Sequence, residues 1–133
     1  MLYFLKKWWP SIVTILVVLY ATLWPDPTGD TDIMIFPGFD KLVHAIMMGG
    51  IASAVLFDHR RFGKPLTMVY IVRVAVTIGI FSALDEYLQG VISPARTFDI
   101  WDIMANVGGI LIASVTAPPV INRLFKKKSA DEN

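Results

Sequence analysis

The 133-residue chain contains no cysteine, and only 17% of its residues are charged. Without cysteine it cannot form a disulfide framework, a thiolate zinc site or a cysteine nucleophile. Soluble domains carry about 25% charged and about 45–50% apolar residues, whereas 55% of this chain is hydrophobic and its mean hydropathy is +0.58. This shortage of charge argues against a disordered chain, a DNA-binding domain and an ordinary soluble enzyme. It indicates a membrane protein, and the length fits one compact unit.

The hydrophobic residues gather in long segments that predict membrane-spanning helices. A helix rises about 1.5 Å per residue, so roughly 20 residues cross a hydrocarbon core of about 30 Å. We expect an all-α fold, a bundle of four transmembrane helices forming a single membrane domain over residues 1–133. The second helix could begin at Phe39 or Asp40, and Pro118 and Pro119 are expected to end the fourth. The expected helices cover residues 8–24, 42–57, 67–84 and 100–120, followed by a basic cytoplasmic tail at 121–133.

Charge is segregated by sign along the chain. If four helices cross in turn, nine of the 12 basic residues fall on one side: Lys6, Lys7, Arg60, Arg61, Lys64, Arg123, Lys126, Lys127 and Lys128. Eight of the 11 acidic residues fall on the other: Asp26, Asp30, Asp32, Asp40, Asp85, Glu86, Asp99 and Asp102. The positive-inside rule then predicts a multi-pass protein of the cytoplasmic membrane with both termini in the cytoplasm. The first helix is expected to be retained, because no A-x-A-like cleavage site follows it.

Polar residues in or beside the expected helices carry the functional signal. They share helix faces and fall in the outer half of the membrane or just beyond it. We expect a ligand-binding cluster that faces outward and contains Asp40, His44, Glu86, Gln89, Arg96, Asp99, Asp102 and Asn106. A charge inside the membrane costs about 2.5 kcal/mol or more, which makes such a cluster a functional candidate. Within it, the catalytic candidates are Glu86, His44, Asp99 and Asp102.

The same residues also have a purely structural interpretation. Arg96 and Lys41 would neutralise the carboxylates, and Asn106 would form a hydrogen bond across helices. Lys41 and Asp85 are otherwise expected to lie at the membrane interface, and Arg73 to extend its guanidinium to the cytoplasmic surface. One imidazole and several carboxylates make a metal site conceivable, but we assign no metal ligands, because no HExxH-type spacing is present. The sequence does not identify a cofactor.

Two segments resemble the VanZ-like membrane proteins, a family of the teicoplanin-resistance type: DKLVHAIMMGGIA at 40–52 and DEYLQGVISPARTFDIWDIMANVGGILIA at 85–113. The family pattern of Asp-Lys before an intramembrane His matches Asp40, Lys41 and His44. Its later run matches Glu86, Gln89, Arg96, Asp99, Asp102, Asn106 and Gly109. The resemblance covers the last three helices. It implies a cell-envelope protein, and the family's namesake lowers sensitivity to teicoplanin without altering the terminus of the peptidoglycan precursor.

Two classes of function stay open. One is a non-enzymatic envelope protein that modulates glycopeptide sensitivity, its cluster binding a partner or the head group of an amphiphile. The other is a small intramembrane enzyme acting on a lipid or lipid-linked head group, with Glu86 or His44 as general base and Asp99 and Asp102 supplying acid, electrostatic support or metal ligands. Expected partners are membrane lipids, a lipid-linked envelope precursor or an amphiphilic antibiotic, and a second copy of the chain. No nucleic acid is expected.

The topology is tested by reporter fusions. Alkaline phosphatase needs an oxidising compartment for its disulfides, so a fusion after Asn133 should be inactive and an insertion within residues 26–32 should be active. Activity from the fusion at Asn133 would contradict the predicted orientation.

Overall fold

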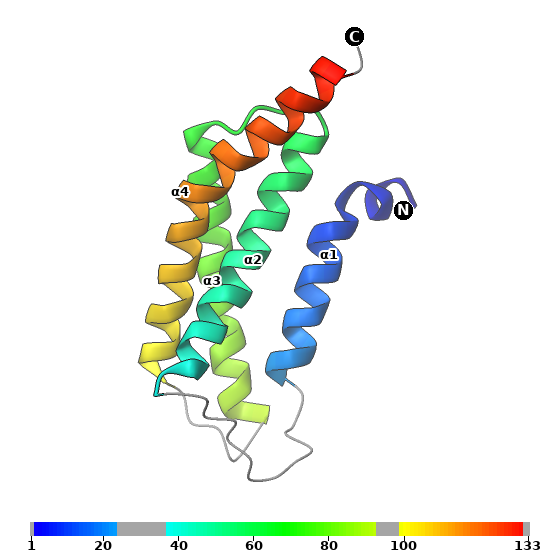
Figure 1. Cartoon of the computed structure of the whole chain (residues 1–133). Coiled ribbons are helices and arrows are strands. Elements are labelled where there is room, and N and C mark those ends of the chain that lie inside the picture. Colours follow the sequence, from blue (N-terminus) through cyan, green and yellow to red (C-terminus); the bar gives the residue numbers. More distant parts are fainter. Residues whose placement is uncertain (1, 24–36, 93–98, 132–133) are drawn as a thin grey trace.

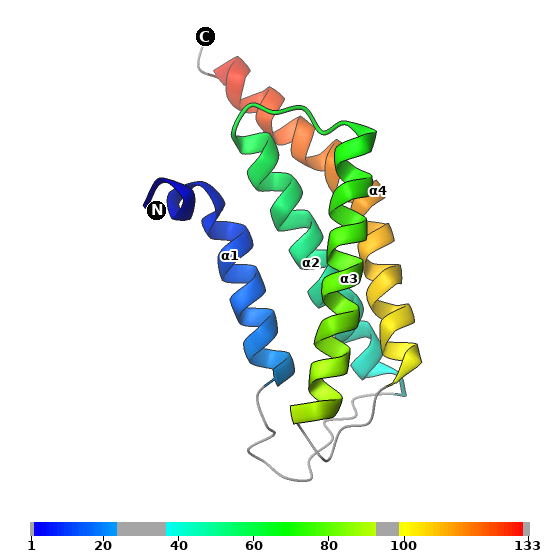
Figure 2. The same ribbon diagram turned by 180° about the vertical axis from the view of Figure 1, so that it is seen from behind.

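The computed structural model describes residues 2–23, 37–92 and 99–131. Four helices form the bundle: α1 (Leu2–Leu23), α2 (Phe39–Arg61), α3 (Met68–Ile92) and α4 (Ile100–Asp131). Successive helices run in opposite directions, so both termini lie toward the same end (Figures 1 and 2). We call the other end, where α1 and α3 end and α2 and α4 begin, the distal end. Each helix is long and apolar enough to cross a membrane, and the predicted all-α, four-span fold is therefore confirmed.

The helices extend beyond their predicted bounds. α2 begins at Phe39, and α3 continues to Ile92, which makes the polar residues after Leu84 helical. α4 passes through Pro118 and Pro119 and ends at Asp131. The prediction that these prolines end the fourth helix is wrong. Figure 1 shows α4 leaning over in its orange part, as expected for a helix bent by prolines.

Contacts with the end of α2 explain why α4 continues beyond its prolines. A proline in a helix interior costs about 3 kcal/mol, and this cost is offset by packing further along. Phe125 lies 5.5 Å from the ring of Phe57, centre to centre. The Arg60 guanidinium lies over the Phe125 ring, and its Nε donates to Asn122 Oδ1 at 3.1 Å. Tertiary packing thus overrides a local signal for helix termination.

A kink divides α1 at Trp8, whose φ of −111° and ψ of 18° are not helical. Figure 1 shows the short N-terminal part turned aside from the rest of the helix. Pro10 has no N–H, so the carbonyl of Lys6 loses its donor within the helix. Arg61 of α2 takes that place, because its guanidinium donates to the Lys6 carbonyl at 3.2 Å and to the Lys7 carbonyl at 2.6 Å.

The fully buried carboxylate of Asp58 caps the longer part of α1. Its Oδ2 accepts the backbone N–H of Ser11 at 3.0 Å and the Ser11 hydroxyl at 2.6 Å. Its Oδ1 lies 3.4 Å from Nη2 of Arg61, one turn along α2. A cap of this kind stabilises a helix by about 1 kcal/mol. Since Asp58 belongs to another helix, it also joins α1 to α2.

The most extensive helix contact is between α2 and α4, and small residues allow it. A Cβ added at Gly109 of α4 would overlap the backbone carbonyl of Ala45 on α2. A Cβ added at Gly49 would lie 2.9 Å from the Gly109 carbonyl oxygen and 3.7 Å from the Cβ of Ala113. On each helix the two small residues are four apart, the spacing that allows close approach of membrane helices. The two backbones therefore touch directly.

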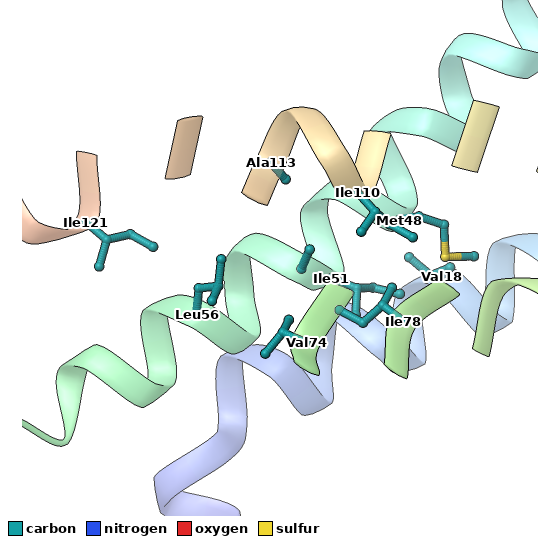
Figure 3. Close-up of a cluster of buried hydrophobic side chains, with 10 residues drawn as sticks. Val18, Met48, Ile51, Leu56, Val74, Ile78, Ile110, Ala113 and Ile121 are labelled. Carbon is teal, nitrogen blue, oxygen red and sulfur yellow. The ribbon is translucent and has the colours of Figure 1, made fainter. Parts of the chain in front are cut away.

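An apolar core fills the middle of the bundle (Figure 3). It contains Val18, Met48, Ile51, Ala52, Leu56, Val74, Ile78, Ile110, Ala113 and Ile121. Many other large apolar side chains, such as Leu16, Val76 and Val115, are exposed on the outside of the bundle. In a membrane these exposed side chains contact lipid, which is as apolar as the core, so core packing alone holds the helices weakly. Specific polar and backbone contacts then decide how the helices are arranged.

The close α2–α4 contact predicts different effects for two substitutions on α4. Gly109→Leu inserts a side chain where the Ala45 carbonyl already lies, and should destabilise the fold by about 3 kcal/mol or more. Leu111→Ile should have little effect, because Leu111 is 57% exposed. Size-exclusion chromatography and thermal unfolding in detergent measure both. Equal losses of folded protein would contradict the assigned contact.

Candidate functional site

A single ammonium group binds three carboxylates at the distal end. Lys41 Nζ lies 2.9 Å from Asp40 Oδ2, 3.1 Å from Asp99 Oδ2 and 3.1 Å from Asp102 Oδ1. The lysine belongs to the first turn of α2, and the last two aspartates belong to the start of α4. The sequence predicts Lys41 either at the membrane interface or as a partner that neutralises the carboxylates, and the structure gives it the second role. In the sequence, this role is indicated by its position directly after Asp40.

Asp99 begins α4 as its N-terminal cap. Its Oδ1 accepts the backbone N–H of Trp101 at 2.8 Å, and its carbonyl accepts the N–H of Asp102 at 3.2 Å. Asp and Asn are favoured at this position because the first turn of a helix has N–H groups without partners. The Trp101 N–H, followed by the Lys41 ammonium, lowers the pKa of Asp99 below its usual value. Asp99 is therefore held as a carboxylate beside the lysine.

Deeper in the bundle, His44, Glu86 and Asp102 come together from three different helices; we call them the inner cluster. His44 Nε2 lies 3.8 Å from Asp102 Oδ2. Glu86 Oε1 accepts the backbone N–H of Asp99 at 3.3 Å. One ligand atom of each member lies within 4.8 Å of the others. Asp102 is thus shared by the inner cluster and the Lys41 ion pairs.

Several buried polar atoms around the inner cluster have no hydrogen-bond partner among the residues that the structure describes. They are His44 Nδ1, Glu86 Oε2, Asn106 Oδ1 and Ser82 Oγ. Glu86 is 3% exposed and Asn106 is 1% exposed. Asn106 lies one turn beyond Asp102, and Ser82 one turn before Glu86, so unused hydrogen-bonding capacity extends into the bundle. Such atoms are rare in native proteins, and each costs about 1–3 kcal/mol when nothing satisfies it.

Asp85 and Gln89 form a second polar group that links α3 to α1. Asp85 Oδ1 accepts from the Thr22 hydroxyl at 3.0 Å, and its Oδ2 accepts from Gln89 Nε2 at 3.0 Å. All three residues are buried. Asp85 was expected at the membrane interface, but the structure buries it in the bundle. Gln89, expected in the ligand-binding cluster, contacts Asp85. Arg96 lies outside the described residues.

The whole chain was then compared with known proteins. A family model described as VanZ/LLP1 matches residues 2–123. The chain belongs to the VanZ/LLP1 family. Comparisons with curated proteins and with solved structures gave no match. The VanZ/LLP1 match includes α1, which lies outside the segments that carry the sequence resemblance, and it ends within α4.

The charge balance determines what this VanZ/LLP1 site attracts. Around Lys41 and the inner cluster, the described carboxylates are Asp40, Glu86, Asp99 and Asp102, against one ammonium group. The surplus of negative charge favours cations and hydrogen-bond donors as ligands. The imidazole and carboxylates of the inner cluster are also acid–base groups and metal-binding groups.

The ion pairs of Lys41 predict a stability that depends on pH. Lys41→Gln leaves three carboxylates facing one another and should destabilise the protein by about 1 kcal/mol near neutral pH. Because the pKa of Asp99 is lowered in the folded protein, its ionised carboxylate stabilises the fold fully at pH values above the pKa in the unfolded chain, about 3.9. This contribution is lost as the pH falls through the lower pKa of the folded state. The stability gap between wild type and variant should therefore narrow below about pH 4.

Thermal unfolding of both proteins in detergent from pH 7 to pH 3 measures this gap. Lys64→Gln is the matched control, because Lys64 is exposed in the loop between α2 and α3. A gap that does not change with pH, or an equal loss of stability in the control, would contradict the role of Lys41.

Proposed function

We propose that this VanZ/LLP1 protein is a non-enzymatic membrane protein of the cell envelope. Its inner cluster, together with Asn106, binds the head group of an amphiphile at the outer membrane surface. The observation that carries the proposal is the unused hydrogen-bonding capacity of Glu86 Oε2, Asn106 Oδ1 and His44 Nδ1. A bound head group would satisfy these atoms.

The chemistry of these atoms describes the ligand. A carboxylate oxygen at Glu86 and an amide oxygen at Asn106 accept hydrogen bonds, and His44 Nδ1 accepts or donates according to its tautomer. The ligand must therefore bring donors, such as the hydroxyls of a sugar or an ammonium group. The surplus of carboxylates favours the ammonium group further. A lipid-linked envelope precursor or a lipid carrying amino or hydroxyl groups fits this description.

The position of the cluster suits an amphiphile. It lies where α2 and α4 begin and α3 ends, so the ligand's apolar tails can lie along the exposed apolar side chains of the same helices. The predicted topology places this end outside the cytoplasm. We further propose that occupation of the site modulates sensitivity to teicoplanin-type glycopeptides, the property implied by the family resemblance.

An enzymatic function is the second candidate, favoured by the close grouping of His44, Glu86 and Asp102. There Glu86 or His44 would act as general base toward a lipid head group, with Asp102 as electrostatic support. Glu86→Gln separates the two functions. The amide keeps a carbonyl oxygen that accepts a hydrogen bond, so binding is retained in part, whereas a general base is abolished.

Native mass spectrometry with lipids retained tests the proposal. Wild type should carry a co-purified amphiphile, and His44→Ala and Asn106→Ala should each reduce its occupancy about tenfold, equivalent to about 1.4 kcal/mol. Ser114→Ala is the control on α4, because the Ser114 hydroxyl bonds within its own helix, to the Ile110 carbonyl at 2.7 Å. Thermal stability and teicoplanin sensitivity are measured on the same variants.

The binding proposal expects folded variants that have lost their ligand. A parallel fall of stability and ligand occupancy in both cluster variants would leave only a structural role. A complete loss of the cellular phenotype in Glu86→Gln, with the ligand still bound, would favour the enzyme.

A further inference from the structure

We propose that the inner cluster binds one divalent transition-metal ion. His44, Glu86 and Asp102 each offer a ligand atom, and the three atoms lie within 4.8 Å of one another. Nitrogen and oxygen ligands lie about 2.0–2.2 Å from zinc, so two ligands of a tetrahedral ion are about 3.4 Å apart. The outermost ligand atoms thus need to approach each other by about 1.4 Å, a movement that rotations about the side-chain torsions can supply.

Each carboxylate of the inner cluster has one oxygen held in place and the other available. Asp102 Oδ1 bonds to Lys41 at 3.1 Å, while its Oδ2 faces His44. Glu86 Oε1 accepts the Asp99 N–H, while its Oε2 is buried without a partner among the described residues. Protein metal ligands are oriented in this way by surrounding hydrogen bonds. Lys41 and the Asp99 backbone would therefore position the ligands without contacting the ion.

Burial supplies an independent reason for a cation at this point. Glu86 is 3% exposed, and the side chains of His44 and Asp102 are 12% and 15% exposed. Two carboxylates this close repel each other where water is scarce, and a divalent ion removes the repulsion. Asn106 Oδ1, buried without a described partner one turn along α4, is a candidate fourth ligand.

The donor set indicates which ions fit. Imidazole suits zinc and other transition metals, carboxylate and carbonyl oxygens also suit manganese, and an all-oxygen set is preferred by magnesium and calcium. One nitrogen with two or three oxygens therefore favours Zn²⁺ or Mn²⁺. The sequence placed these residues in one polar cluster but gave no metal-ligand spacing, because the ligands come from three different helices.

Ion binding needs no lipid and is tested on the protein alone. The ion and the head group of the proposed function would use the same Glu86 and Asn106 oxygens, so the two proposals are tested separately.

The experiment uses the full chain, purified in detergent and stripped with EDTA. Isothermal titration with ZnCl₂ or MnCl₂ should give one site per chain, with MgCl₂ and CaCl₂ binding at least about tenfold more weakly. Glu86→Gln and His44→Gln should each weaken Zn²⁺ binding by about tenfold or more. His59→Gln, which removes the chain's other imidazole at the opposite end of α2, should bind Zn²⁺ within about twofold of wild type.

X-ray absorption of the zinc-loaded wild type gives a result that does not depend on the folding of variants. One imidazole in a shell of oxygen ligands is expected. An all-oxygen shell, no stoichiometric ion, Mg²⁺ or Ca²⁺ binding as tight as Zn²⁺, or an equal loss in His59→Gln would each overturn the proposal. A wild-type protein that binds Zn²⁺ but carries no lipid would contradict the proposed head-group binding and would leave the metal proposal standing.

Discussion

The direct backbone contact between α2 and α4 determines the geometry of everything at the distal end. Gly109 lies against the Ala45 carbonyl, so no side chain can separate the two helices there. Ala45 follows His44, and Gly109 lies on the same helix face as Asp102 and Asn106. Once these backbones touch, the first turns of α2 and α4 must lie side by side, which brings Lys41 to the aspartates of α4. The polar site is thus positioned by residues that are themselves apolar or have no side chain.

Polar contacts hold both ends of the bundle, and apolar packing fills the middle. At the distal end Lys41 joins α2 to α4, and Asp85 joins α3 to α1 through Thr22. At the other end Asp58 and Arg61 join α2 to α1. This distribution suits a protein in lipid, where the hydrophobic effect does little to hold helices together. Among the described residues both ends keep buried polar atoms without a hydrogen-bond partner: Asp58 Oδ1 and Arg61 Nε at one end, and atoms of His44, Ser82, Glu86 and Asn106 toward the distal end.

The sequence predicted the features that depend on periodicity and composition. The four spans follow from hydrophobic runs, and the faces shared by the polar residues follow from helical spacing. The features that depend on tertiary contacts were missed. α4 continues beyond Pro118 because α2 supplies Arg60 and Phe57 as partners, and nothing near the prolines in sequence reveals this. Asp58 is followed by basic residues in the sequence, a pattern typical of a charged surface position. In the structure it is fully buried and caps α1, a helix far from it in the sequence.

The joint between α1 and α2 also has a consequence for biosynthesis. The chain is made from its N-terminus, so α1 is synthesised before Asp58 and Arg61. Without α2 the Lys6 carbonyl has no donor within its helix, because Pro10 has no N–H, and it must bond to water at the membrane surface. Once α2 has packed against α1, the Arg61 guanidinium takes the place of that water. The kink in α1 is thus the part of the first helix whose hydrogen bonds are completed only when the second helix packs against it.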